Sequence, residues 1–207
     1  MATSLAKENI LRKIRQALSN PVPLPFALRE GTQSVFNPVQ DEIAVVFATA
    51  FSGLQGKFSY CADENEVVLQ INQLIAQKEW TKVFCSNEKW VDTFSNTINL
   101  SSCDVAITAC ECLIARTGTI VLSASETNGR TASVYAPVHI CIAYTNQLVP
   151  DVKDGLQFLK EKYQNQLPSF ISFSSGPSRT ADIEKTLVTG VHGPKEVFLF
   201  LIESENS

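Results

Sequence analysis

Residues 174–202, which read SSGPSRTADIEKTLVTGVHGPKEVFLFLI, predict the fold more strongly than any other stretch of the chain. Glycine and proline punctuate both ends of residues 174–194 and mark two breaks. Residues 180–187 are compatible with a helix, for which Ser178 or Thr180 would supply the cap. The unbroken apolar run 197–202 is typical of a buried strand. A strand before the segment, the helix and this last strand would form one unit of an alternating α/β fold.

The rest of the chain repeats this alternation. Short apolar runs predict strands at 57–61, 83–85, 104–108, 119–123, 138–143 and 170–173. Amphipathic or capped stretches predict helices at 39–54, 63–79, 87–96, 109–115 and 151–163. In the second of these helices Asp63 is the expected cap, with Glu66 three residues on. This order predicts an α/β fold with a mostly parallel sheet and helices on both faces.

The first residues of the chain have a different character. Residues 4–18 carry apolar side chains at three- and four-residue steps with lysine and arginine between them, which predicts an amphipathic helix. Four prolines follow within 20–38, and proline disfavours both helices and central strands. We therefore expect an N-terminal helix at 1–19, an extended linker at 20–38 and an α/β domain at 39–207.

Composition narrows the class of protein. The chain has 207 residues, of which 44% are hydrophobic and 18% charged, and these values are ordinary for a globular protein. Its net charge of −4 removes the electrostatic attraction on which nucleic-acid binding depends, so we expect no nucleic-acid partner. No apolar run approaches the roughly 20 residues that span a membrane, and the first residues lack the apolar core of a signal peptide. We expect a cytoplasmic protein without a membrane span.

The cysteines indicate buried thiols rather than a metal site. Of the six, only Cys110 and Cys112 are close in sequence, and the two histidines do not complete a zinc-binding spacing. An iron–sulfur cluster needs four cysteine ligands. We therefore expect no metal and no cofactor in this chain.

Polar residues flank the predicted strand 119–123. Thr117-Gly118-Thr119 lies at its start, and a loop containing the turn Asn128-Gly129 and then Arg130 follows it. If strands 119–123 and 170–173 run parallel in one sheet, the loops after both strands open at the same edge. Open α/β sheets bind ligands at that edge.

Arg130 and Arg179 would then meet near the start of helix 180–187, whose free backbone N–H groups favour anions. These groups predict a pocket for a carboxylate or a phosphate. The alternative is that both arginines pair with nearby acids such as Asp182. Asp182 also has a purely structural interpretation, because the helix dipole favours an acid in the first turn.

The two histidines differ in their surroundings. His192 lies between Gly190 and Gly193, and its ordinary pKa near neutrality suits an acid or a base. If 180–187 is a crossover helix, however, His192 lies about 12–15 Å from Arg179 at the other edge of the sheet. A structural role in the turn is the alternative. His139 falls inside a predicted strand and is expected to be packed there.

Several of these segments resemble one known family. Residues 178–184 (SRTADIE), then 190–194 (GVHGP) and the terminal apolar run, resemble the C-terminal signature of the lactate utilization protein C (LUD domain) family. Residues 114–119 (IARTGT) and the later Gly129-Arg130 resemble its central motif. The end of the first helix resembles its leading segment. Arg116 departs from the pattern, because the family leads us to expect an acidic residue there.

The resemblance implies a fold similar to the NagB/RpiA/CoA-transferase class. It also implies a role in oxidising L-lactate to pyruvate alongside iron–sulfur partner proteins. Two hypotheses follow: a non-redox subunit or accessory protein of such a system, or a stand-alone enzyme or binder of a phosphorylated, CoA-linked or folate-like molecule. The candidate ligand-binding residues are Thr117, Gly118, Thr119, Gly129, Arg130, Ser178, Arg179, Thr180, Asp182 and His192.

Overall fold

The computed structural model describes residues 5–18, 41–97, 99–125, 130–164, 166–180 and 188–204. Its contacts divide the chain into residues 1–38 and residues 39–207. In the first unit the described element is helix α1 (Leu5–Leu18), which confirms the predicted amphipathic helix. Ile10 and Ile14, one helical turn apart, are exposed on it. The linker predicted at 20–38 lies outside the described residues.

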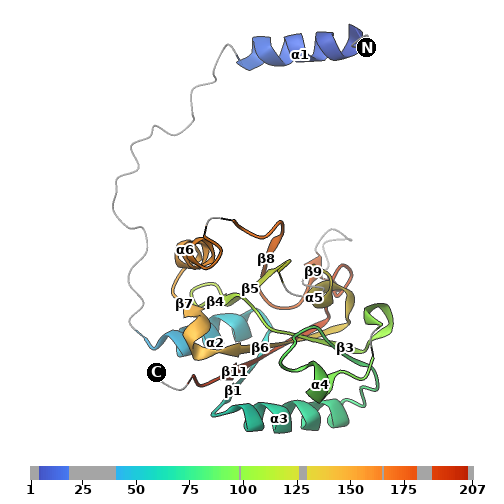
Figure 1. Ribbon diagram of the computed structural model, residues 1–207, viewed down its shortest axis with the longest axis vertical. Coiled ribbons are helices and arrows are strands. Elements are labelled where there is room, and N and C mark those ends of the chain that lie inside the picture. The colour runs from blue at the N-terminus through green and yellow to red at the C-terminus, as the bar shows by residue number, and fades with distance from the viewer. Residues whose placement is uncertain are drawn as a thin grey trace. The chain divides into compact units, whose positions relative to one another are not determined.

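The second unit is built around a five-stranded parallel sheet (Figure 1). Its strands lie in the order β1 (Lys57–Cys61), β11 (Glu196–Ile202), β6 (Val138–Tyr144), β3 (Val105–Thr108) and β2 (Val83–Cys85). Every neighbouring pair is parallel. The inner strands consist almost entirely of buried apolar residues, as expected of a sheet covered on both faces. All five strands confirm sequence predictions.

Helices cover one face of this sheet. Helix α3 (Glu64–Gln77) begins at the predicted cap, where the Asp63 carboxylate accepts from the Glu66 N–H at 2.8 Å. Val67 and Ile71 of α3 pack into the apolar core on this face, together with Phe94 of the short helix α4 (Val91–Phe94). The predicted helix 87–96 is therefore shorter than expected. Asn87 instead accepts from the Lys89 N–H in the preceding turn.

A second sheet covers the opposite face, so the prediction of helices on both faces is only partly right (Figure 1). Its strands lie in the order β7 (Leu148–Val149), β4 (Cys112–Ile114), β5 (Thr119–Ser123) and β8 (Ile171–Ser174). Strand β5 runs antiparallel to both β4 and β8, whereas β4 and β7 are parallel. The predicted helix 109–115 is wrong, because Cys112–Ile114 pairs with β5 as a strand.

Helix α2 (Ile43–Gly53) packs against the second sheet. Phe47 and Phe51 of α2 are fully buried, and they share one apolar core with Leu113 and Ile120 of the second sheet and Leu199 of β11. Burying a large apolar side chain of this kind contributes about 1.5–3 kcal/mol. The two sheets and α2 are therefore held together by one continuous core.

Helix α6 (Val152–Lys162) covers the outer face of the second sheet (Figure 1). Its buried Leu159 packs against Cys112, Ile114 and Val121. Asp151 caps the helix, and the Asp154 carboxylate accepts from the Asp151 N–H in return.

The remaining elements are short. They are the helices α5 (Ala132–Tyr135), η1 (Leu100–Ser102) and η2 (Thr145–Gln147) and the paired strands β9 (Arg179–Thr180) and β10 (Val188–Thr189). In the described part of the chain, none of the helices is long and apolar enough to cross a membrane.

Candidate ligand-binding site

The two loops expected to share one edge leave opposite ends of the second sheet. Strands β5 and β8 are antiparallel, with Ile120 opposite Ser174 and Ser123 opposite Ile171. Arg130, which follows β5, donates to the Ser169 hydroxyl just before β8 begins. The shared edge predicted for Arg130 and Arg179 is therefore wrong, because it required parallel strands in one sheet.

Thr117, Gly118 and Thr119 make close contacts inside the fold. The Thr119 hydroxyl lies 2.7 Å from that of Thr117 and 2.6 Å from that of Ser175. Gly118 has a φ of +56°, and a Cβ on it would lie 2.5 Å from the backbone nitrogen of Phe51. The backbone of the second sheet thus approaches α2 so closely here that only glycine fits.

The C-terminal signature forms a pair of short strands. Arg179 lies opposite Thr189 and Thr180 opposite Val188, in antiparallel register. Thr180, the first residue of the predicted helix 180–187, therefore lies in a strand. Residues 181–187, with the candidate Asp182, lie outside the described residues, as does Gly129. His192 follows β10 by three residues, so the separation expected from a crossover helix does not apply.

Backbone hydrogen bonds of Ser178 connect this strand pair to the turn at 190–194. Its N–H donates to the Pro194 carbonyl at 3.0 Å, and its own carbonyl accepts from the Gly190 N–H at 2.9 Å. A Cβ on Gly193 would lie 3.0 Å from the Ser178 Cβ, so the two backbones approach closely. The two halves of the signature, 178–180 and 190–194, therefore form one unit that places His192.

Lys195 belongs to the same unit, although the sequence analysis did not single it out. Gly190 has a φ of +77°, and a Cβ on it would lie only 2.2 Å from the Lys195 Cγ. The methylene chain of Lys195 therefore lies directly on the Gly190 backbone. The Lys195 N–H also donates to the Pro137 carbonyl at 2.7 Å. A basic residue directly after the Gly-Pro turn was the available signal.

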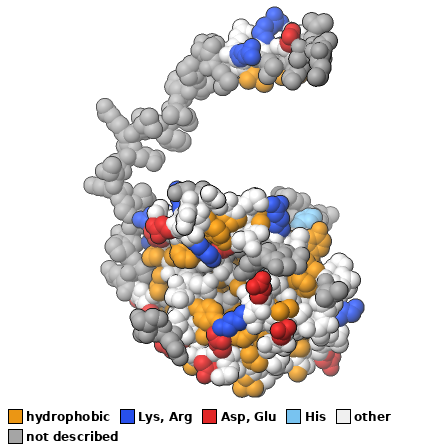
Figure 2. Space-filling model, in the orientation of Figure 1, with side chains coloured by type: hydrophobic (Ala, Val, Ile, Leu, Met, Phe, Trp, Pro, Cys, Tyr) orange, Lys and Arg blue, Asp and Glu red, His pale blue; other side chains and the backbone are white. Residues whose placement is uncertain are grey.

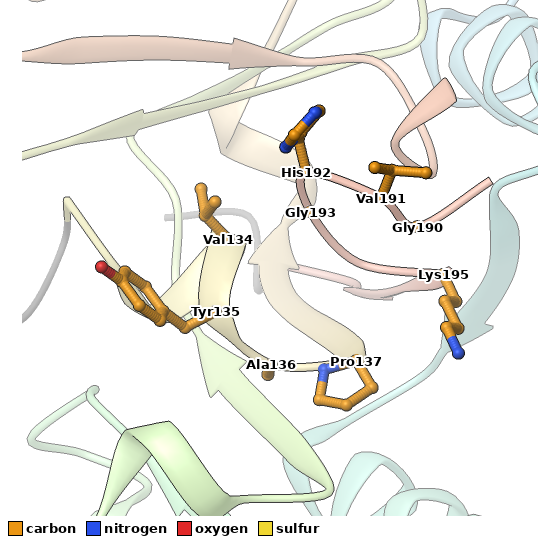
Figure 3. A pocket seen from close by; sticks show the side chains of 9 residues that line it. All are labelled: Val134, Tyr135, Ala136, Pro137, Gly190, Val191, His192, Gly193 and Lys195. Carbon is orange, nitrogen blue, oxygen red and sulfur yellow. The ribbon is translucent and has the colours of Figure 1, made fainter. Parts of the chain in front are cut away.

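A cavity of about 480 Å³ opens beside this unit (Figure 3). We call it the hairpin pocket, and its lining residues are Val134, Tyr135, Ala136, Pro137, Gly190, Val191, His192, Gly193 and Lys195. In Figure 3 the segment from Val134 to Pro137 faces the segment from Gly190 to Lys195 across the opening. Both segments immediately precede parallel strands, β6 and β11. The hairpin pocket therefore lies at the amino edge of the parallel sheet, opposite the edge predicted from the fold class.

The rim of the hairpin pocket is apolar as well as polar. Val134, Tyr135 and Val191 are 43%, 66% and 44% exposed, which is high for such side chains. In Figure 2 a histidine surface meets hydrophobic side chains at the upper right of the body. An apolar wall beside a lysine and an imidazole is a combination that binds ligands with both an apolar and a charged part.

A second cavity, of about 470 Å³, lies at the carboxyl edge of the parallel sheet and has the opposite charge. Asp63, Glu64 and Glu203 contribute carboxylates to its lining. Hydrogen bonds from Lys89 and Tyr144 hold the pKa of Glu64 below its usual value, so this carboxylate is ionised at neutral pH. This cavity repels a carboxylate or phosphate, and the hairpin pocket is the better candidate for an anion.

A buried carboxylate, that of Glu111, and the cluster of donors around it were not predicted from the sequence. Glu111 is 3% exposed and accepts from the hydroxyls of Ser123, Ser125 and Tyr163 and from Lys162 at 2.7 Å. Burial alone would raise the pKa of Glu111, but these hydrogen bonds outweigh it and lower the pKa. The cluster ties the end of β5 to the end of α6.

Arg116, where the resemblance led us to expect an acidic residue, has a structural role. Its Nε donates to the Asp151 carboxylate at 2.9 Å, and its backbone N–H donates to the Pro150 carbonyl. Because Asp151 caps α6, Arg116 connects the turn before β5 to the start of that helix.

His139 is packed inside the parallel sheet, as expected. It is fully buried, and its Nε2 lies 2.8 Å from the Thr108 hydroxyl. Burial lowers the pKa of His139 to about 4, so the ring is neutral at physiological pH.

The cysteines are all buried and carry no disulfide. Burial raises the pKa of Cys61 to about 11 and that of Cys112 to about 12, which keeps both as neutral thiols at pH 7. Within the described ranges, no three His, Cys, Asp or Glu side chains gather as metal ligands would.

Comparison with known proteins identifies the family to which the chain belongs. The family model for the LUD domain matches residues 78–202, more than half of the chain, and the chain belongs to this family. A solved DUF162 family protein from Deinococcus radiodurans shares the fold, with a TM-score of 0.57 over 77% of this chain and 96% of its own, at 19% identity.

Individual relatives show which named proteins the chain resembles. Lactate utilization protein C from Bacillus velezensis is 38% identical over 101 residues, and that from Bacillus subtilis is 36% identical over 101 residues. Each match covers 48% of this chain and 42% of the relative. An uncharacterized protein from Neisseria meningitidis serogroup B is 34% identical over 115 residues, 56% of this chain and 48% of its own. The chain thus spans about half the length of the curated relatives it matches.

Proposed function

We propose that this chain is a non-redox subunit or accessory protein of a system that oxidises L-lactate to pyruvate, acting with iron–sulfur partner proteins. The observation that carries the proposal is the 36–38% identity to proteins named lactate utilization protein C over about half of the chain, together with the LUD domain match. The C-terminal part of the resemblance supports it, because residues 190–193 line one pocket and Ser178 is bonded to the turn that carries them.

The chemistry of the oxidation supports a division of labour. Converting L-lactate to pyruvate removes a pair of electrons, which must pass to an acceptor. Thiols bind an iron–sulfur cluster as thiolates, whereas the six thiols here are all buried, and burial raises the pKa values of Cys61, Cys103 and Cys112. Partner proteins that hold such clusters would therefore accept the electrons.

The hairpin pocket favours a second candidate function, a stand-alone enzyme or binder of a phosphorylated, CoA-linked or folate-like molecule. Its volume of about 480 Å³ falls in the range of small-molecule sites, roughly 300–1,000 Å³. Such a protein would bind its ligand without any partner, and its deletion would leave lactate oxidation intact.

Deleting the encoding gene in its own organism tests the first proposal. We expect growth on L-lactate as sole carbon source to fail, growth on pyruvate to be unaffected, and the full chain supplied in trans to restore growth. Growth on pyruvate is the control, because pyruvate lies after the oxidation. Undiminished L-lactate consumption by the deletion strain would contradict the proposal.

A further inference from the structure

We propose that the hairpin pocket binds an organic anion larger than lactate, with its anionic head group at Lys195 and its apolar body against Val134 and Val191. This inference rests on the second candidate function and assigns it a site and a ligand class. It is tested by binding to the purified chain, so its failure is separate from a failure of the lactate role.

The charge of the lining residues favours an anion. Among the nine residues that line the pocket there are one lysine and one histidine and no acidic side chain. Other lysines of the body face carboxylates: Lys57 pairs with Glu196, Lys89 with Glu64 and Lys162 with Glu111. Within the part of the chain that the structure describes, Lys195 makes no such pair. A lysine that lines a pocket whose described lining has no carboxylate attracts a carboxylate or phosphate.

The turn holds the first part of the Lys195 side chain in place. The Lys195 Cγ occupies the space that a Cβ on Gly190 would take, and the backbone N–H of Lys195 donates to the Pro137 carbonyl. The first part of the side chain is therefore held against the backbone, and ordering it on binding costs less entropy. His192, on the same turn, presents ring nitrogens that donate or accept a further hydrogen bond.

The size of the pocket argues against lactate as its occupant. A water molecule takes about 30 Å³ of liquid volume, so 480 Å³ corresponds to roughly 16 waters. Lactate, with about six non-hydrogen atoms, would leave most of this space and the apolar wall unfilled. A ligand that also covers Val134, Tyr135 and Val191 removes exposed apolar surface from water, which contributes about 25 cal/mol per Å².

Binding of matched probes to the full-length chain tests the inference. Phenylbutyrate and phenyl phosphate carry an apolar body with the two kinds of head group, and they show which head group the pocket prefers. L-lactate and inorganic phosphate supply head groups alone, and phenylbutyramide supplies a body without charge. We expect at least one of the two larger anions to bind about tenfold more tightly than the head groups alone and than the amide. NMR shifts of the Val134 and Val191 methyl groups would locate the bound probe.

Variants assign the binding to Lys195. Lys195→Met should weaken the preferred anion about tenfold and Lys195→Arg should retain it. Lys153→Met, on the exposed surface of α6, is the matched control and should bind as the wild type does. The inference is overturned if neither larger anion binds, if L-lactate or the amide binds equally well, or if Lys195→Met binds as tightly as Lys153→Met.

Discussion

His139 is a buried base with one ring nitrogen, Nδ1, that has no hydrogen-bond partner among the described residues. Its pKa is lowered from 6.5 to about 4 by burial, so the folded protein resists protonation that the unfolded chain accepts. Between these two pH values the unfolded state binds more protons, and stability falls as pH falls. The contribution of His139 is complete above about pH 6.5.

We expect the free energy of unfolding to decrease by about 3 kcal/mol between pH 6.5 and 4 through His139, at 1.36 kcal/mol per pKa unit. Urea unfolding across this range measures it. His139→Gln, which cannot titrate, should flatten the pH dependence. His192→Gln removes the other histidine of the sequence, whose side chain is exposed, and serves as the matched control. An unchanged slope in His139→Gln would show that other groups cause the loss.

At the residue scale, the sequence predicted the positions of the turns better than the residues that contact them. Gly190 and Gly193 lie in a predicted break and Gly118 at a predicted strand start, and at each of the three two chain segments approach closely. The partners in these approaches, Phe51, Lys195 and Ser178, follow from tertiary contacts that local sequence does not encode. Lys195 was missed for that reason.

Among the elements, β5 and α6 are joined by the buried Glu111. Its carboxylate accepts from three hydroxyls and an ammonium group. The carboxylate of Glu64 accepts from Lys89 and the Tyr144 hydroxyl at the surface, with 44% of its side chain exposed. A buried charge that loses its hydrogen bonds cannot turn to water, whereas an exposed one can.

Glu111→Gln should therefore lower the free energy of unfolding by about 3 kcal/mol, since several charge-assisted hydrogen bonds become neutral or lose their acceptor. Glu64→Gln is the matched control and should cost less than about 1 kcal/mol. Chemical denaturation of both variants at pH 7 gives the comparison. Equal losses would mean that the Glu111 cluster contributes no more than a surface ion pair.

Strand positions could be predicted from the sequence, but their directions and partners could not. The runs 119–123 and 138–143 predict buried strands equally well. Yet 119–123 lies in the mixed sheet and 138–143 in the parallel sheet. Cys112–Ile114 lacks the β-branched run that marks a strand and was assigned to a helix. The candidate pocket was placed at the wrong edge because it required strands 119–123 and 170–173 to be parallel, and they are antiparallel.

At the scale of the whole molecule, a mixed sheet packs on one face of a parallel sheet and helices pack on the other (Figure 1). The alternation of predicted elements identified the α/β class, and the motifs identified the LUD family. The second sheet was not foreseen, because its short strands resemble connections between strands of a single sheet. Residues 190–193 of the C-terminal signature lie at the amino edge of the parallel sheet, where they line the hairpin pocket.

Affinity purification of the tagged full chain from lactate-grown cells tests the central claim, a non-redox role beside iron–sulfur partners, most directly. Iron content and L-lactate-dependent dye reduction would be measured in the complex and in the chain purified alone. We predict iron and dye reduction in the complex, and neither in the isolated chain. Stoichiometric iron or lactate-dependent reduction in the isolated chain, or a chain that retains no iron-containing partner, would contradict the account.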